Sequence, residues 1–185
     1  MNNWGNILKL SIFGESHGST IGINIGGLPA GVRIDEDRIA KEMKRRAPGN
    51  GAHSTARKEA DRVRIVSGVR NGKTTGAPLC GLIENTDQRS SDYGNILRPG
   101  QADWAALIKY GGFADVSGSG HFSGRVTAPI VFAGAIAKTI LEEKGIEIYA
   151  RIKAIAGKSD TIELTGKYIK ARGRESVLLR TISEK

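Results

Sequence analysis

Three histidines offer the simplest acid–base chemistry in this sequence of 185 residues. His17 lies in the turn Gly14-Glu15-Ser16-His17-Gly18, where an imidazole that titrates near neutral pH can give a proton to a departing phosphate. A turn histidine bonded to the nearby backbone fits the same spacing equally well. His53 lies in a polar loop and, taken alone, is more typical of a solvated side chain. His121 follows Gly118-Ser119-Gly120 and is either a ligand contact on that glycine loop or a capping or surface residue.

Arginines form the second chemical pattern. They lie in or beside loops, next to glycine, proline, serine or threonine, where a guanidinium fork can bind phosphate or carboxylate through two parallel hydrogen bonds. A substrate with several anionic groups would need several such forks. Each arginine taken alone is more often a solvated charge, but we do not expect the whole set to be idle. The set comprises Arg45, Arg46, Arg57, Arg89, Arg98 and Arg125.

The chain carries a net charge of +9, and 25 of its residues are glycine. A basic excess favours anionic partners, namely nucleic acid, acidic lipid, or phosphorylated and carboxylated metabolites. A generally basic surface is the alternative. Clustered glycines indicate tight turns and backbone that approaches a ligand closely. Because only 5% of residues are aromatic, a base-stacking platform is disfavoured, and we expect a small anionic substrate rather than nucleic acid.

Motifs of several other enzyme classes are absent from the sequence. There is no HExxH, no CxxC and no histidine pair at ligand spacing, so no metal site is predicted. Gly72-Lys73-Thr74 lacks the preceding glycine of a Walker A loop, and residues 22–27 are not a dinucleotide-binding GxGxxG. The His17 turn also lacks the context of a nucleophile elbow. Hydrolase and Rossmann-type functions therefore receive little support.

Strands and helices that could position these residues alternate along the chain. Residues 9–13 and 21–25 predict two strands, joined as a hairpin by the His17 turn. Asp35 can cap a helix that runs to about Arg46, with acidic residues in its first turn and basic residues in its last.

Further strands are predicted at residues 62–69 and 79–83, with a glycine turn around Asn71-Gly72. Residues 85–110 show little periodicity and predict a long loop, which in a compact domain is usually functional or disordered.

The clearest helix is predicted to begin at Thr127, which would cap it, with Pro129 in its first turn. This helix is apolar on nearly every side, so we expect it to be buried on more than one face, as a helix between sheets would be. Residues 146–152 alternate as a further strand. Interspersed strands, hairpins and helices indicate an α+β fold, with an antiparallel sheet packed on a layer of buried helices.

The sequence also predicts where in the cell the protein lies. No run of 18 apolar residues occurs, and the first ten residues lack a basic segment followed by an apolar one, so neither a transmembrane helix nor a signal peptide is expected. Cys80 is the only cysteine and cannot form an internal disulfide, which fits a reducing cytoplasm.

Motifs over roughly residues 6–152 resemble, in order, those of the chorismate synthase family. The blocks are Phe13–Gly18, Arg45–Gly49, Ser54–Asp61, Ser67–Val69, Gly72–Pro78, Asn85–Ser90, Arg98–Gly100, Gly120–Arg125 and Ala133–Ala137. So many blocks in family order make a chance match implausible.

The resemblance implies a reaction and a cofactor. The family converts 5-enolpyruvylshikimate 3-phosphate to chorismate by a 1,4-elimination of phosphate, in aromatic amino acid biosynthesis. Reduced FMN is required without net redox change, and some members use NADPH to reduce the flavin. The substrate has one phosphate and two carboxylates, which agrees with the arginine set. The implied architecture is half of a β-α-β sandwich, and the implied assembly is a homo-oligomer, a tetramer in the family.

By the same resemblance, His17 is the acid that assists phosphate departure. The candidates for binding the anionic groups of substrate or NADPH are, with the first named foremost, Arg46, Arg57, Arg98 and Arg125. The match to the flavin-contacting segment of the family comprises His121, Phe122 and Ser123.

Two departures from the family pattern affect the expected activity. Gln101 stands where the family has its second functional histidine, and an amide cannot carry a proton near neutral pH, so we expect weakened catalysis. The chain has about half of the family's length: residues 1–155 are the chorismate synthase-like region and residues 156–185 an unrecognised tail, divergent or truncated. We therefore expect a weak or inactive form, and the alternative is a non-catalytic protein that binds anions or pairs with other subunits.

Overall fold

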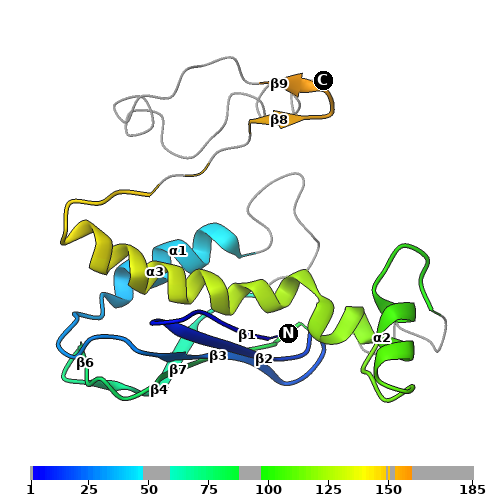
Figure 1. Ribbon diagram of the computed structural model, residues 1–185, viewed down its shortest axis with the longest axis horizontal. Coiled ribbons are helices and arrows are strands. Elements are labelled where there is room, and N and C mark those ends of the chain that lie inside the picture. The colour runs from blue at the N-terminus through cyan, green and yellow to red at the C-terminus, as the bar shows by residue number, and fades with distance from the viewer. Residues whose placement is uncertain (1, 48–58, 88–96, 149, 151–152, 160–185) are drawn as a thin grey trace. The chain divides into compact units, whose positions relative to one another are not determined.

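The computed structural model describes residues 2–47, 59–87, 97–148, 150 and 153–159 of the chain (Figure 1). The chain divides into two compact units, residues 1–143 and residues 144–185. His53, Arg57 and Arg89, which the sequence analysis singled out, lie outside the described residues.

A five-stranded antiparallel sheet forms the base of the first unit, with strand order β1-β2-β3-β7-β4 (Figure 1). The strands are β1 (Asn3–Trp4), β2 (Lys9–Gly14), β3 (Thr20–Gly26), β4 (Val63–Ser67) and β7 (Leu79–Glu84). The predicted hairpin is present as β2 and β3, with Ile12 opposite Ile23, and β3 continues the sheet by pairing Ile23 with Gly81 of β7. The α+β class and the antiparallel sheet are thus confirmed.

Alternation along β3 places one row of its side chains in the core. Ile21, Ile23 and Ile25 are at most 1% exposed, whereas Asn24 between them is exposed. Successive strand residues point to opposite faces of a sheet, so the three isoleucines share the face that the helices cover. Each isoleucine buried in this way stabilises the fold by roughly 1.5–3 kcal/mol relative to its exposed state.

Helix α1 (Glu36–Arg46) follows the predicted capping scheme. The Asp35 side chain accepts a hydrogen bond from the backbone N–H of Arg38 at 2.9 Å. This bond satisfies one of the unpaired donors at the helix start, and Glu36 and Asp37 complement the helix dipole. Both predicted inner residues, Ile39 and Met43, are buried.

Helix α3 (Ala128–Glu142) packs on β3 and β7 and lies beside α1 (Figure 1). Pro129 sits in its first turn as predicted, but Thr127 does not cap it, because its hydroxyl donates backward to the carbonyl of Gly124. The reason is that a 3₁₀ segment, η3 (Gly124–Thr127), runs directly into the helix, so Thr127 already has helical backbone angles.

Phe132 of α3 fills the space above a strand glycine. A Cβ added at Gly81 would lie 2.4 Å from Cε1 of the Phe132 ring, so only glycine allows this approach.

By length and composition alone, Ser117–Glu142 could cross a membrane. That is weak evidence, because the core helix of a soluble protein passes the same test, and α3 buries Phe132 and Ile136 in the core.

Besides the Thr127 cap, two further sequence predictions of local structure were wrong. The predicted loop at 85–110 contains helix α2 (Asp103–Lys109), whose two turns are too short to give a clear periodicity but whose start is held by a buried carboxylate of Asp103. The predicted strand at 146–152 is absent over residues 146–148, which are irregular, and most of the remainder lies outside the described residues. An alternating pattern forms a strand only where a partner strand supplies hydrogen bonds.

Two small hairpins complete the described structure. One joins β5 (Val69–Arg70) to β6 (Lys73–Thr74) through Asn71 and Gly72, which both have positive φ, as the predicted glycine turn requires. The second unit contains the other hairpin, formed by β8 (Ala154–Ile155) and β9 (Lys158–Ser159).

Candidate functional site

His17 lies in the connection between β2 and β3, against a glycine-rich loop. A Cβ added at Gly118 would lie 2.5 Å from Cδ2 and 2.6 Å from Nε2 of the His17 ring, so the imidazole packs on the bare backbone of that glycine. The backbone N–H of Ser16 donates to the carbonyl of Gly120 at 3.1 Å. The His17 turn is therefore fastened to the loop that precedes α3, about 100 residues later in the chain.

The glycine loop belongs to the 3₁₀ segment η2 (Ser117–Phe122), whose centre is not helical. Gly118, Ser119 and Gly120 have φ values of 58°, 71° and 52°. A Cβ at Gly120 would lie 2.1 Å from the carbonyl oxygen of Asp115. The glycines are thus required by the tight path of the loop and by its contact with His17.

Arg125 follows this loop in the chain, and its side chain is buried. Its Nη1 pairs with Oδ1 of Asp61, and its Nε lies 3.0 Å from Oε2 of Glu59 and 3.0 Å from Oδ1 of Asn85. Its Nη2 donates to the carbonyl of Glu84 at 3.4 Å. The side chain is 4% exposed, so two protein carboxylates compensate its charge where water cannot.

Asn85 connects Arg125 to the His17 turn. While its Oδ1 accepts from Arg125, its Nδ2 donates to the carbonyls of Glu15 at 3.1 Å and Gly18 at 2.6 Å. Both carbonyls belong to the turn that carries His17. One buried amide therefore ties the candidate proton donor and a candidate cation into one hydrogen-bonded unit.

Arg46, the last residue of α1, joins the same cluster. Its Nη1 pairs with Oδ2 of Asp61 at 2.9 Å, and its Nη2 donates to the carbonyl of Gly124 at 3.1 Å. Asp61 is thus shared by two guanidinium groups, one on each carboxylate oxygen. The Arg46 side chain remains 21% exposed, so of the two arginines it is the one that can reach a ligand.

Arg98 and Gln101 lie together beside the glycine loop. Arg98 grips Asp103 through Nε at 2.8 Å and Nη2 at 2.9 Å, and these bonds hold the pKa of the Asp103 carboxyl below its usual value. The same Nη2 also donates to the carbonyl of Val116 and to Oγ of Ser119. Ser119 in turn donates to Oε1 of Gln101 at 3.3 Å. Arg98 therefore holds the glycine loop in place through these hydrogen bonds.

His121 and Phe122, predicted from the flavin-contacting segment, form a ring cluster with Tyr110. The centroids of His121 and Phe122 are 4.0 Å apart, and the Tyr110 hydroxyl lies 3.3 Å from Nε2 of His121. Phe122 is 43% exposed, so one side of the cluster is open to solvent. Ser123, the third residue of this set, instead uses its hydroxyl to accept the backbone N–H of Arg125 at 3.2 Å.

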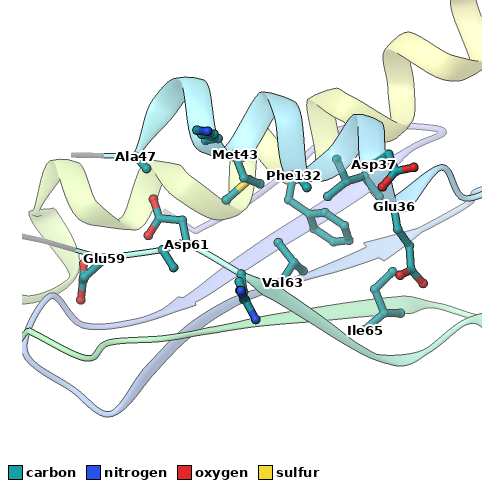
Figure 2. A pocket seen from close by; sticks show the side chains of 14 residues that line it. Glu36, Asp37, Met43, Ala47, Glu59, Asp61, Val63, Ile65 and Phe132 are labelled. Carbon is teal, nitrogen blue, oxygen red and sulfur yellow. The ribbon is translucent and has the colours of Figure 1, made fainter. Parts of the chain in front are cut away.

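A cavity of about 780 Å³ lies between α1 and the edge strand β4 (Figure 2). Its middle is apolar, and Glu59 and Asp61 line one end. His17, Arg46 and Arg125 are not among its lining residues. His17 and the two arginines are therefore joined through Asn85 and Asp61 rather than through this cavity.

Four side chains that organise the site were not singled out by the sequence analysis: Asp61, Asn85, Asp103 and Ser119. Asp61 and Asn85 do stand in two of the motif blocks, which was the available signal, but a polar residue in a loop gives no hint of burial. Arg57 lies outside the described residues. Within the described part of the chain, no group of three or more His, Cys, Asp or Glu side chains is arranged to hold a metal ion.

Comparison with known proteins identifies the family. The chorismate synthase family profile matches residues 8–183. The chain belongs to the chorismate synthase family. Enzymes of this family are generally flavin-dependent lyases of aromatic biosynthesis. The family match runs through the residues beyond 155, for which the motifs had shown no counterpart.

Individual chorismate synthases agree with this assignment. The chain is 49% identical to that of Desulfovibrio desulfuricans over 84% of this chain and 44% of the relative. It is 43% identical to that of Nitratiruptor sp. over 96% of this chain and 54% of the relative. A crystal structure of chorismate synthase matches with a TM-score of 0.56 and 32% identity, over 76% of this chain and 36% of that chain. The chain spans about half the length of the curated relatives that it matches.

Proposed function

We propose that this chain provides the acid and anion-binding part of a chorismate synthase site, for elimination of phosphate from 5-enolpyruvylshikimate 3-phosphate to give chorismate. The observation that carries the proposal is the double role of Asn85, which hydrogen-bonds both the His17 turn and the Arg125 guanidinium. Family membership supplies the reaction, and this arrangement supplies a fixed imidazole next to a cationic cluster.

His17 is the proposed acid. An imidazolium can donate a proton to the phosphate as the C–O bond breaks, which avoids release of a more highly charged anion. The ring is oriented by its packing on Gly118 and by the two carbonyl bonds that Asn85 makes to its turn. A fixed orientation matters because proton transfer requires hydrogen-bond distance in the reacting geometry.

Arg125 and Arg46 differ in exposure and have two different proposed roles. Arg125 is buried, and each of its three nitrogens has a protein acceptor, so it holds Asp61 and the His17 turn in place. Arg46 uses only part of its five N–H donors on described partners and is partly exposed, so it is the proposed contact for a substrate carboxylate or phosphate. Arg98 and Arg57 stay candidates for the anionic groups of substrate or NADPH on the family resemblance alone.

Reduced FMN is the proposed cofactor, and the ring cluster fits it. Phe122, which is 43% exposed and lies at a tilt of 34° to His121, offers an open aromatic face on which a planar tricyclic ring can stack. The flavin, when bound, supplies the electron-rich chemistry of the reaction, and this chain orients it against the substrate. NADPH is proposed as the reductant.

Gln101 contacts the loop that packs against His17. Its amide oxygen accepts the Ser119 hydroxyl beside the loop that meets His17. An amide in this place can orient a neighbour but cannot transfer a proton, so we propose slower turnover than in relatives with a histidine there.

The proposed architecture and setting follow from the family. The sheet and its helices correspond to half of a β-α-β sandwich, supported by the apolar outer residues of α3, such as Ile130, which is 38% exposed. We propose a cytoplasmic homo-oligomer, a tetramer as in the family, without nucleic acid or membrane partners.

Burial raises the pKa of the Cys80 thiol, which keeps it a neutral, poorly reactive thiol at neutral pH.

The test is anaerobic phosphate release and chorismate formation from the phosphorylated substrate with reduced FMN. His17→Ala should lower kcat by about 10²–10⁴-fold, the usual contribution of a general acid. Arg70→Ala, an exposed cation on β5, is the matched control and should leave kcat unchanged. Turnover that survives His17→Ala would refute the proposed role of His17.

A non-catalytic, subunit-pairing function is the second candidate, favoured by exposed apolar side chains around α2. Trp104 is 63% exposed, Ile108 66% and Phe113 94%, and such groups invite association. A titration of the full chain with reduced FMN, with and without substrate, separates the two functions. Tighter flavin binding in the presence of substrate supports the enzyme site, and absence of flavin binding supports the pairing function.

A further inference from the structure

The glycine loop contains one residue with a side chain, Ser119, whose backbone conformation favours glycine. Ser119 has a φ of 71°, a conformation that side-chain-bearing residues rarely adopt, between two glycines whose φ values are also positive. Those glycines are explained by space, since a Cβ at either would collide with the His17 ring or with the carbonyl of Asp115. A glycine at 119 would fit the same backbone without strain. Ser119 therefore carries a side chain at a position whose backbone favours glycine.

The Ser119 hydroxyl joins the loop to a rigid neighbour. It accepts from Nη2 of Arg98 at 3.0 Å and donates to Oε1 of Gln101 at 3.3 Å. Arg98 is itself fixed by Asp103, which is 2% exposed. The chain of hydrogen bonds therefore runs from the half-buried Arg98–Asp103 ion pair through one hydroxyl to an amide, and it fixes the position of the loop at Ser119.

Both chain neighbours of Ser119 contact the His17 turn. Gly118 lies against the His17 ring, and the carbonyl of Gly120 accepts the backbone N–H of Ser16. We propose that Ser119 is a positioning residue that holds this loop against the His17 imidazole and so sets the orientation of the acid. This proposal rests on the proposed function of His17, but its structural part can be tested separately.

The experiment uses the full chain and two variants that separate strain from the hydroxyl. Ser119→Gly removes the hydroxyl and the strain, and Ser119→Ala removes the hydroxyl alone. Ser67→Ala is the control, because it likewise removes a serine hydroxyl that donates a hydrogen bond, here to the backbone carbonyl of Pro78 and away from the glycine loop, on β4. Imidazole NMR resonances of His17, assigned with His17→Asn, are recorded over pH together with thermal unfolding and steady-state kinetics.

A positioning role predicts that both Ser119 variants move the His17 resonances and its titration midpoint, whereas Ser67→Ala does not. Ser119→Gly should shift the His17 resonances without lowering the melting temperature. A purely structural role would instead lower the melting temperature and leave the His17 resonances in place. For the reaction, kcat should fall about fivefold to tenfold at unchanged KM, the equivalent of one lost hydrogen bond.

Unchanged His17 resonances in both Ser119 variants would overturn the inference, and so would an equal shift in Ser67→Ala. If the resonances move as expected while the unaltered chain releases no phosphate, the positioning of His17 is supported and the proposed function fails. The two proposals are thus distinguished by one set of samples.

Discussion

At the scale of single residues, the candidate arginines within the described ranges all pair with the protein's own carboxylates. Arg125 pairs with Glu59 and Asp61, and Arg98 pairs with Asp103. A guanidinium held in this way keeps its charge but loses donors for a ligand, since each N–H can point in only one direction. The proposed contact with an anionic substrate therefore falls to Arg46, which is partly exposed and uses only part of its donors on described partners.

The Asp103–Arg98 pair predicts a specific response to acid. Hydrogen bonds from Arg98 lower the pKa of Asp103, so its contribution to stability is complete above the unfolded pKa of about 4 and is lost as pH falls through the lower folded pKa. The difference in unfolding free energy between the unaltered chain and Asp103→Asn should be constant above about pH 5 and should shrink below about pH 4.

Urea unfolding, followed by the fluorescence of Trp104 and Trp4, measures this difference at each pH. Asp37→Asn, an exposed carboxylate in the first turn of α1, is the control. A free-energy difference for Asp103→Asn that does not change across the acid range would contradict the assignment.

At the scale of elements, the position of α3 on the sheet depends on one close contact. The Phe132 ring lies where the Cβ of residue 81 would be, so helix and strand approach more closely than a side chain at 81 would permit. This contact fixes α3 and, through η3, the start of the segment that carries Arg125. The element-scale packing therefore sets the geometry of the site.

Gly81→Ala should destabilise the fold by about 1–3 kcal/mol, because the added methyl group overpacks the core against Phe132. Gly134→Ala on α3 is the matched control: no heavy atom lies within 4 Å of its Cβ position, and alanine favours a helix by about 0.5–1 kcal/mol over glycine. Thermal and urea unfolding of the two variants should shift in opposite directions. Equal stability of Gly81→Ala and the unaltered chain would show that Phe132 can move away.

At the scale of the whole first unit, one carboxylate holds together segments that are far apart in sequence. Asp61 binds Arg46 at the end of α1 and Arg125 before α3, which are 15 and 64 residues away. Removing one partner from a buried ionic cluster leaves an uncompensated charge, which is far more costly than losing a solvent-exposed pair.

Asp61→Asn should therefore cost about 3–5 kcal/mol of unfolding free energy. Glu142→Gln, which removes the more exposed ion pair with Arg38 that also joins α1 and α3, should cost at most about 1 kcal/mol. Urea denaturation at neutral pH compares the two variants. The cluster would lose its assigned role if the two costs were the same.

The sequence by itself determined the local elements of this protein. Alternating isoleucines predicted β3, and Asp35 with its acidic first turn predicted α1, because strand alternation and helix capping depend on residues close in the chain. The ordered motifs likewise predicted the family, the His17 turn and the aromatic segment at 121–122. Local signals failed at α2, because its two turns are too short to give a clear periodicity.

Only the tertiary structure decided which side chains meet. Nothing near Asn85 in sequence indicates that it bonds the His17 turn, about 70 residues earlier, and Arg125, 40 residues later. The same holds for Ser119 and its bonds to Arg98 and Gln101. Burial and hydrogen-bond pairing arise when distant segments pack, and a sequence read along the chain contains only the separations, not the contacts.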